Sequence, residues 1–278
     1  MGDSVVLVKH EGDLEETLKK AIDLVGGFGS LRSPIVIKPN ICADYDRTGF
    51  AVTDVNVVEL LSRLILKEDR ELSVKIVESD SGSKWADEAF EIFGYKSLEE
   101  NMKRLGFDVS LINLSQSPTN VVKLDGLHFK ELKLPRIILG SKYFVSLAVA
   151  KTHGLAFITG ALKNLFGLIP RKDQHIYHPY IHEVIVDLTR VIKPDLCIID
   201  ARVGLEDWMG PTKRRLDTFI VGKNPVSVDA IMARAMGFEP RKVRHLVEAE
   251  KIGLGSLNPK VRGIELESIK VQFNPPYA

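Results

Sequence analysis

Residues 143–150 read Tyr-Phe-Val-Ser-Leu-Ala-Val-Ala, and this run limits the possible folds more than any other feature of the sequence. A strand with one face in water alternates apolar and polar residues, whereas this run is apolar at nearly every position. Such runs are typical of strands that are buried on both faces in a parallel sheet covered by helices. The sequence therefore predicts that residues 143–150 form a central strand of a parallel sheet.

Short apolar runs alternate with segments of helical periodicity along the rest of the chain, which is the pattern of an α/β protein. Further strands are expected at residues 4–9, 34–38, 74–78, 107–111, 196–200 and 218–221. Helices are expected at residues 13–25, 84–93, 98–105, 155–168, 225–236 and 243–249, after Thr53, and from His178-Pro179 onward. We predict an α/β fold with a mostly parallel sheet flanked by helices, in one or two adjoining lobes.

A hairpin is expected where Asp125-Gly126 lies between residues 121–124 and 127–130, because this dipeptide tolerates the positive φ of a type I′ turn. Residues 137–139 are expected to form another short strand. The hairpin also marks the expected boundary between an N-terminal α/β lobe, residues 1–115, and a C-terminal α/β lobe, residues 116–278. A single domain is the alternative.

Charge and cysteine content exclude several classes of protein. Lys and Arg total 38 while Asp and Glu total 37, so the net charge is +1, whereas a dedicated nucleic-acid binder depends on a strong positive field. Cys42 and Cys197 alone cannot hold an iron–sulfur cluster. No apolar run reaches the roughly 20 residues of a membrane span, and no secretory signal is visible. We expect a cytoplasmic protein that binds neither nucleic acid nor membranes and has no intrinsic iron–sulfur cluster.

Polar side chains follow four of the predicted strands at the point where each apolar run ends. These side chains are Lys38 and Asn40, Asp80, Lys151 and His153, and Asp200. In open parallel sheets, ligands bind beyond the carboxyl ends of the strands, where the strand order reverses. The pattern predicts one polar crevice, although strand ends are also polar simply because the chain turns there.

The segment from Lys151 to Gly167 contains the sharpest candidate site. Gly154 permits a tight turn from strand to helix, and the N-terminus of a helix at residues 155–168 attracts anions. Lys151, Lys163 and Asn164 are the candidate anion ligands in this segment. It matches neither the Walker loop nor the dinucleotide-binding fingerprint. The alternative is a packed helix with solvated lysines.

Three histidines follow, His175, His178 and His182, and their spacing suggests a metal site if the last two share a helical face. No neighbouring cysteine or carboxylate completes a known ligand spacing. We favour instead an acid–base role for His153 or His175, because the pKa of histidine is already near neutrality. Lys172 is the nearby candidate for substrate binding.

These stretches resemble the family called Domain of Unknown Function 362. The matching pieces are Lys38-Pro-Asn40, Lys151-Thr-His153, residues 159–167, Asp200 with its Gly-Pro loop, residues 224–230, and Gly253-Leu-Gly255. The resemblance covers nearly the whole chain. Members of the family are often joined to a ferredoxin-like module, and this sequence contains none, so the resemblance implies a separate ferredoxin-like protein as a possible partner. The loop after Asp200 lacks some glycines typical of the family.

Taken together, these features predict an enzyme that binds a small anion, carboxylate or phosphate, in a crevice at the strand ends. Lys38, Asn40, Lys151, Lys163, Asn164 and Lys172 bind the anion, while His153 and His175 transfer protons and Asp80 and Asp200 orient them. Proton transfer beside a carboxylate is the favoured reaction class. Two alternatives remain open: a non-catalytic accessory subunit that docks a separate ferredoxin-like partner, and a metal-dependent hydrolase using His175, His178 and His182.

Overall fold

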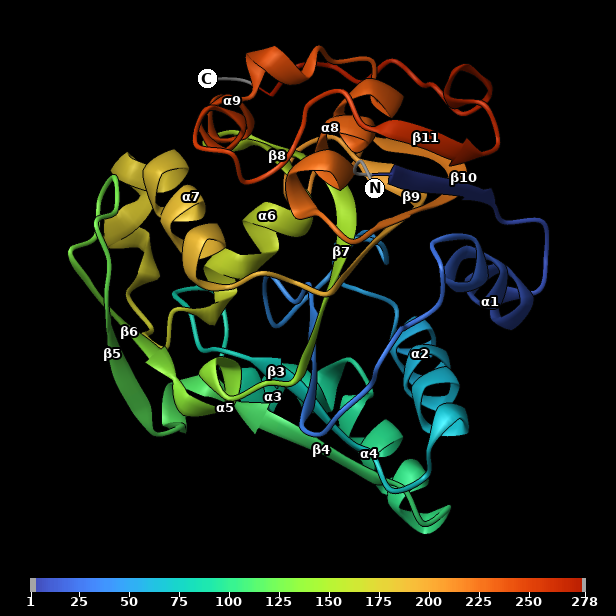
Figure 1. Cartoon of the computed structure of the whole chain (residues 1–278), viewed down its shortest axis with the longest axis vertical. Coiled ribbons are helices and arrows are strands. Elements are labelled where there is room, and N and C mark those ends of the chain that lie inside the picture. Colours follow the sequence, from blue (N-terminus) through green and yellow to red (C-terminus); the bar gives the residue numbers. More distant parts are fainter. Residues whose placement is uncertain (1–3, 277–278) are drawn as a thin grey trace.

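Nine strands form one mixed sheet in the computed structural model, which describes residues 4–276 (Figure 1). Their order across the sheet is β11-β1-β10-β9-β7-β2-β3-β4, and β8 pairs with β7 alone. The strands are β1 (Ser4–Lys9), β2 (Ile35–Pro39), β3 (Ser73–Glu78), β4 (Asp108–Asn113), β7 (Tyr143–His153), β8 (Phe157–Thr159), β9 (Leu196–Leu205), β10 (Lys213–Gly222) and β11 (Lys260–Gly263).

The centre of the sheet is parallel. Strand β2 pairs in parallel with both β3 and β7, β3 pairs with β4, and β7 pairs with β9. Strand β1 is parallel to β11, and only the pairings of β10 with β1 and β9, and of β8 with β7, are antiparallel. The predicted α/β fold with a mostly parallel sheet flanked by helices is therefore confirmed, and the run at 143–150 lies in a central strand.

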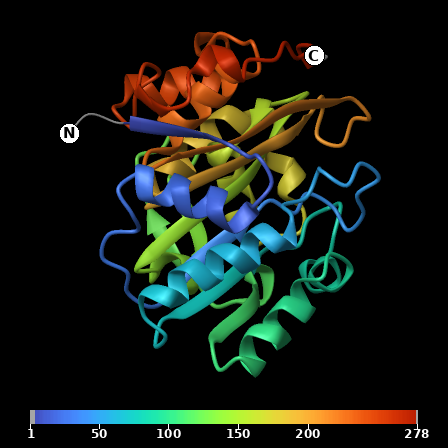
Figure 2. The same ribbon diagram turned by 90° about the vertical axis from the view of Figure 1, so that its right-hand side faces the viewer.

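Helices cover both faces of the sheet. One face packs against α1 (Leu14–Leu24), α2 (Val55–Glu68), α3 (Ala86–Ile92) and α4 (Tyr95–Arg104). The other packs against α6 (Ala161–Asn164), α7 (Ile181–Val191), α8 (Pro225–Ala235) and α9 (Arg244–Lys251). Figure 2 shows α1 and α2 in front of the sheet. Successive residues of β7 enter opposite layers, Phe144 on one side and Val145 on the other, which explains why both must be apolar.

The remaining elements are short. They comprise a separate hairpin of β5 (Thr119–Lys123) and β6 (Glu131–Pro135), the single helical turn α5 (Arg136–Leu139), and five 3-10 segments, η1 (Leu114–Gln116), η2 (Leu165–Leu168), η3 (Gln174–Tyr180), η4 (Pro240–Lys242) and η5 (Leu266–Ser268). Strands from both sides of the expected boundary near residue 115 share the large sheet. The division into two lobes stays a prediction.

The helix expected at residues 155–168 is wrong in its first half. After Gly154 the chain turns back as β8, which pairs antiparallel with β7, and helix α6 begins only at Ala161. The buried carboxylate of Asp229, on α8, accepts hydrogen bonds from the backbone N–H groups of Ala161 and Leu162 at 2.7 and 3.0 Å. Because both N–H groups are satisfied by an acid from a distant segment, the helix offers no anion site at its N-terminus.

Two smaller expectations are also wrong. Residues 127–130 do not form a strand, because the buried carboxylate of Asp187 accepts hydrogen bonds from the N–H groups of Leu127, His128 and Phe129 and holds them in a loop. Gly126 therefore lies in a wider turn than the expected two-residue one. Residues 137–139 lie in α5 and not in a strand.

We predict that Asp229→Ala lowers the free energy of unfolding by at least about 2 kcal/mol, because it leaves two buried N–H groups without an acceptor, at about 1–3 kcal/mol each. Chemical denaturation followed by circular dichroism measures this change. Asp125→Ala is the control, since its exposed carboxylate pairs only with Lys130 and such pairs contribute about 1 kcal/mol or less. Equal losses in the two variants would contradict the structural role of Asp229.

Candidate functional site

A cavity of about 460 Å³ opens at the carboxyl ends of β2, β3 and β7. The chain runs outward from β2 through β3 to β4 and then returns to form β7 on the other side of β2, so the strand order reverses between β2 and β7. Lys38 and Asn40 lie at the end of β2 on one side of this reversal, and Lys151 and His153 lie at the end of β7 on the other side. This is the place where open α/β sheets bind ligands.

Most of the predicted site residues line this cavity. They are Lys38, Asn40, Lys151, His153, Lys163, Asn164, His175 and His178. Asp80, Lys172, His182 and Asp200 do not belong to its lining. The cavity is also lined by residues that were not among the predicted site residues, including Cys42, Glu78, Ser81, Gly82, Ser83, Lys84, Thr159, Phe166, Gly167 and Gln174.

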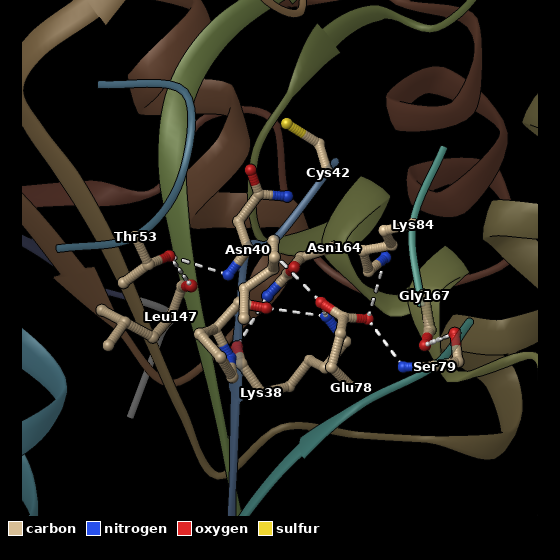
Figure 3. A network of polar contacts seen from close by, with 12 residues as sticks. Lys38, Asn40, Cys42, Thr53, Glu78, Ser79, Lys84, Leu147, Asn164 and Gly167 are labelled. Carbon is tan, nitrogen blue, oxygen red and sulfur yellow. Dashed lines mark hydrogen bonds and ion pairs between the residues drawn. The ribbon is translucent and has the colours of Figure 1, made fainter. Parts of the chain in front are cut away.

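Glu78 is the central acid of the site (Figure 3). It ends β3, is 1% exposed, and lies between Lys38 and Lys84. One of its carboxylate oxygens accepts a hydrogen bond from the Lys38 ammonium at 2.8 Å, and the other is 3.6 Å from the Lys84 ammonium. One carboxylate thus pairs with two buried cations. Burial lowers the pKa of Lys38, and the charge of Glu78 opposes that effect.

Gly167 permits the close packing around this ion pair. A Cβ atom at this position would lie 3.0 Å from Lys38 Cε and 3.1 Å from Glu78 Oε1. Its carbonyl also accepts a hydrogen bond from the Ser79 hydroxyl at 2.7 Å. Glycine at position 167 therefore brings the end of η2 against the ends of β2 and β3 and closes one side of the cavity.

Lys151 is buried without an acidic partner. It is 1% exposed, and its ammonium donates hydrogen bonds to Asn40 Oδ1 and to the carbonyl of Ala51, each at 2.8 Å. The thiol of Cys42 lies 3.6 Å from the same ammonium. No carboxylate within residues 4–276 forms an ion pair with it. The two oxygens orient the ammonium, and no carboxylate compensates its charge.

The loop that supplies these acceptors is attached to the central strands. Thr53 Oγ1 accepts a hydrogen bond from the N–H of Asn40 at 2.7 Å and donates one to the carbonyl of Leu147 at 3.2 Å (Figure 3). Thr53 was expected to begin the following helix, but Asp54 caps it instead. The Thr53 hydroxyl therefore joins the loop after β2 to β7 and holds Asn40 next to Lys151.

Asn164 contributes an unused acceptor. Its amide nitrogen donates hydrogen bonds to the carbonyl of Lys38 at 2.9 Å and to Ser146 Oγ at 3.2 Å, which fixes the side chain. The residue is 2% exposed, and its carboxamide oxygen has no hydrogen-bond partner. Buried acceptors without partners are rare in folded proteins. The oxygen is available to a donor in the cavity.

Lys163 lies one residue before Asn164 on α6. Its ammonium is 4.4 Å from the centre of the Phe166 ring, and no hydrogen-bond acceptor or carboxylate in the described chain pairs with it. Burial lowers the pKa of Lys163 to about 8, and the charge of Lys151 acts in the same direction. With a pKa of about 8, the side chain is mostly protonated at neutral pH, and a minor fraction of it is the neutral amine.

His153 carries its proton on a defined nitrogen. Its Nδ1 accepts hydrogen bonds from the N–H groups of Leu155 and Ala156 at 3.1 and 3.2 Å, so Nδ1 has no proton and Nε2 does. Burial, and after it the charges of Lys163 and Lys151, lower the pKa of His153 to about 2. The imidazole is neutral at physiological pH, and its Nε2–H is a hydrogen-bond donor.

His175 and His178 come from η3 at the mouth of the cavity. His175 is exposed, whereas His178 is half-buried with its ring 6.0 Å from that of Phe166. Burial lowers the pKa of His178, and the charge of Lys163 adds to this effect. Of the two rings, His178 is the one that packs against Phe166, another residue of the lining, so it is the better placed for proton transfer within the cavity.

Asp80 and Asp200 do not orient these histidines. Asp80 accepts hydrogen bonds from the N–H of Ala86 and from Asn113 Nδ2, so it holds the start of α3. Strand β9 continues to Leu205, which places Asp200 inside the strand and not at its end. Its carboxylate pairs with Arg202 at 2.7 Å beside a second cavity of about 520 Å³. The expected convergence of all strand-end side chains is wrong for these two acids.

Lys172 and His182 also lie elsewhere. The ammonium of Lys172 is stacked over the Trp85 ring, and the Nδ1 atoms of His182 and His245 are 3.1 Å apart between α7 and α9. His182 is thus separated from His175 and His178, which line the cavity. Between residues 4 and 276 no three His, Cys, Asp or Glu side chains are arranged to hold a metal ion.

None of the helices in the part of the chain that the structure describes has the length and apolarity of a transmembrane span. The expected cytoplasmic location stays a prediction.

Several known proteins resemble this chain. A thylakoid-associated protein of Synechocystis sp. is 23% identical over 274 residues, which span 91% of this chain and 81% of that protein. The lactate racemase apoprotein from Thermoanaerobacterium thermosaccharolyticum matches 91% of this chain with a TM-score of 0.43 and 12% identity. A protein of known structure from Thermotoga maritima matches 88% with a TM-score of 0.42 and 14% identity. The chain spans 57% and 60% of the lengths of these two structures.

The family comparison confirms the resemblance seen in the motifs around Lys38, Lys151 and Lys163. The sequence model of the family described as Domain of unknown function (DUF362) matches residues 35–234, from the first residue of β2 to the last turn of α8. Because this match covers well over half of the chain, the protein belongs to the DUF362 family.

Proposed function

We propose that the cavity at the ends of β2, β3 and β7 binds a small anionic molecule through a carboxylate or phosphate group. The observation that carries this proposal is the ammonium of Lys151, which is buried beside two neutral oxygens and the Cys42 sulfur, with no carboxylate partner in the described chain. A buried charge is costly unless it is paired, so a protein that maintains one has a reason to do so. An anionic ligand beside Lys151 supplies the missing partner.

The charges of the whole lining support the same conclusion. Four lysines line the cavity, Lys38, Lys84, Lys151 and Lys163. Their acidic counterparts in the lining are Glu78, which is shared by two of them, and Asp207, which is exposed to solvent. Because fields are weakly screened in a partly enclosed site, the excess positive charge attracts an anion strongly. A volume of about 460 Å³ suits a small molecule.

Two of the lining side chains favour chemistry on the bound anion. His153 offers an N–H donor, and Lys163 offers an amine whose pKa of about 8 lets it accept a proton near neutral pH. An acceptor of this kind next to anion-binding lysines fits proton abstraction beside a carboxylate. We therefore propose an enzyme of this class, with Lys151 as ligand for the anion and the amine of Lys163 as the reactive group.

Lys151→Met tests the binding of the anion, because it keeps the length of the side chain and removes its charge. We expect affinity for small carboxylates and phosphates to fall at least about tenfold, since a hydrogen bond to a charged group contributes about 1.5–3 kcal/mol. Calorimetric titration with a panel of such molecules measures the change. Lys20→Met removes the same charge from the exposed surface and should bind like wild type. Binding that is the same in all three proteins would refute the role of Lys151.

Glu78→Gln tests the charge balance of the site. The variant leaves Lys38 and Lys84 without their shared carboxylate, and breaking a buried ion pair costs about 3–5 kcal/mol of folding free energy. We expect the double variant Lys38→Met/Glu78→Gln to recover part of this loss, because it removes one of the two unpaired cations. Denaturant unfolding of both variants checks this. A double variant no more stable than Glu78→Gln would show that the stability does not depend on this charge balance.

A further inference from the structure

We propose that the amine of Lys163 forms an imine with the carbonyl group of its substrate, so that the ligand of the cavity is a small oxo acid. This inference rests on the proposed anion binding and adds the carbonyl group to the substrate class. It starts from the position of Lys163, whose side chain lines the cavity and has no acceptor or carboxylate partner in the described part of the chain.

The surroundings of Lys163 separate it from the other lysines of the site. Lys38 and Lys84 share the carboxylate of Glu78, and Lys151 donates to two oxygens. The amine of Lys163 faces the Phe166 ring instead. Since a lysine engaged in hydrogen bonds must break them before it attacks a carbonyl carbon, Lys163 is the lysine of this cavity that is free to react.

Several titratable groups act on the Lys163 amine. Lys38 comes from β2, Cys42 from the loop after it, Lys84 from the segment before α3, Lys151 and His153 from β7, and His178 from η3. Burial and the three lysine charges favour the neutral amine, while Cys42 opposes them. Only the neutral amine is a nucleophile, and desolvation together with neighbouring cations is a known way to produce it.

The reaction balances without a further reagent. The nitrogen of Lys163 attacks the carbonyl carbon, the C–O bond breaks, and the oxygen leaves as water with the two protons of the amine. A C=N bond then joins Nζ to the substrate. The Nε2–H of His153 is the donor available to the departing oxygen, and the ammonium of Lys151 holds the carboxylate. The imine withdraws electrons from the adjacent carbon and makes its C–H bond easier to deprotonate.

Reductive trapping tests this inference on the whole chain. Cyanoborohydride reduces an imine to a stable secondary amine, so incubation with glyoxylate or pyruvate should attach the probe to Lys163. Peptide mass spectrometry of the wild-type protein locates the adduct. We expect at least tenfold more adduct at Lys163 than at the exposed Lys20, and half-maximal labelling near pH 8, whereas an ordinary lysine requires a pH near its usual pKa of 10.5. Lys163→Met, with circular dichroism as a check of folding, should lose this adduct.

A second pair of measurements separates this inference from the proposed anion binding. Pyruvate that binds in calorimetry but leaves Lys163 no more labelled than Lys20 overturns the imine and leaves the anion site in place. Removing the charge of Lys151 raises the pKa of Lys163 and so lowers labelling by any carbonyl compound, which propanal, having no carboxylate, measures alone; the pyruvate adduct should fall about tenfold further than the propanal adduct in Lys151→Met. If Lys151→Met reduces pyruvate labelling no more than propanal labelling, the amine is reactive but the oxo acid is not the preferred class, and the inference fails.

Discussion

The rest of the site depends on the ion pairs that the carboxylate of Glu78 forms with Lys38 and Lys84. This carboxylate accepts hydrogen bonds from the Lys38 ammonium and from the N–H of Ile41, and it lies within ion-pair distance of Lys84. These contacts join the ends of β2 and β3 to the loop before α3. Because Glu78 is shared in this way, it stabilises two cations and has no capacity left for Lys151 or Lys163. The cavity is positively charged because the lining has more lysines than carboxylates to pair with them.

Two further buried acids decide the shape of the chain around the cavity. Asp229 on α8 caps the start of α6 and so places Lys163 and Asn164 beside β2. Asp187 on α7 accepts hydrogen bonds from three N–H groups of the loop between β5 and β6. In each case the carboxylate accepts hydrogen bonds from backbone N–H groups that have no partner within a helix or a strand. Because these two carboxylates are hydrogen-bonded to the backbone, they stabilise the fold and do not pair with the lysines of the cavity.

The lysines of the cavity therefore divide into separate roles. Lys38 and Lys84 neutralise Glu78, and Lys151 carries an uncompensated charge held in place by Asn40. Lys163 lacks any such partner, and burial and the neighbouring cations both oppose its charge and lower its pKa. A site with one fixed cation and one amine that readily loses its proton distinguishes the two ends of a small ligand, since an acidic end is drawn to the former and an electrophilic end to the latter.

The sequence by itself determined the parallel sheet and the residues that leave its central strands. Continuous apolar runs occur only where both faces of a strand are covered, and the polar residues that end them had to emerge at the same edge, so Lys38, Asn40, Lys151 and His153 were predicted to meet. It did not reveal Glu78, which follows an apolar run like any strand-end acid, nor the antiparallel turn of β8. The pairing of Glu78 with Lys38 and the capping of Ala161 by Asp229 join residues 40 and 68 positions apart. Only the tertiary structure decided those contacts, because local periodicity carries no information about which distant acid satisfies a buried donor.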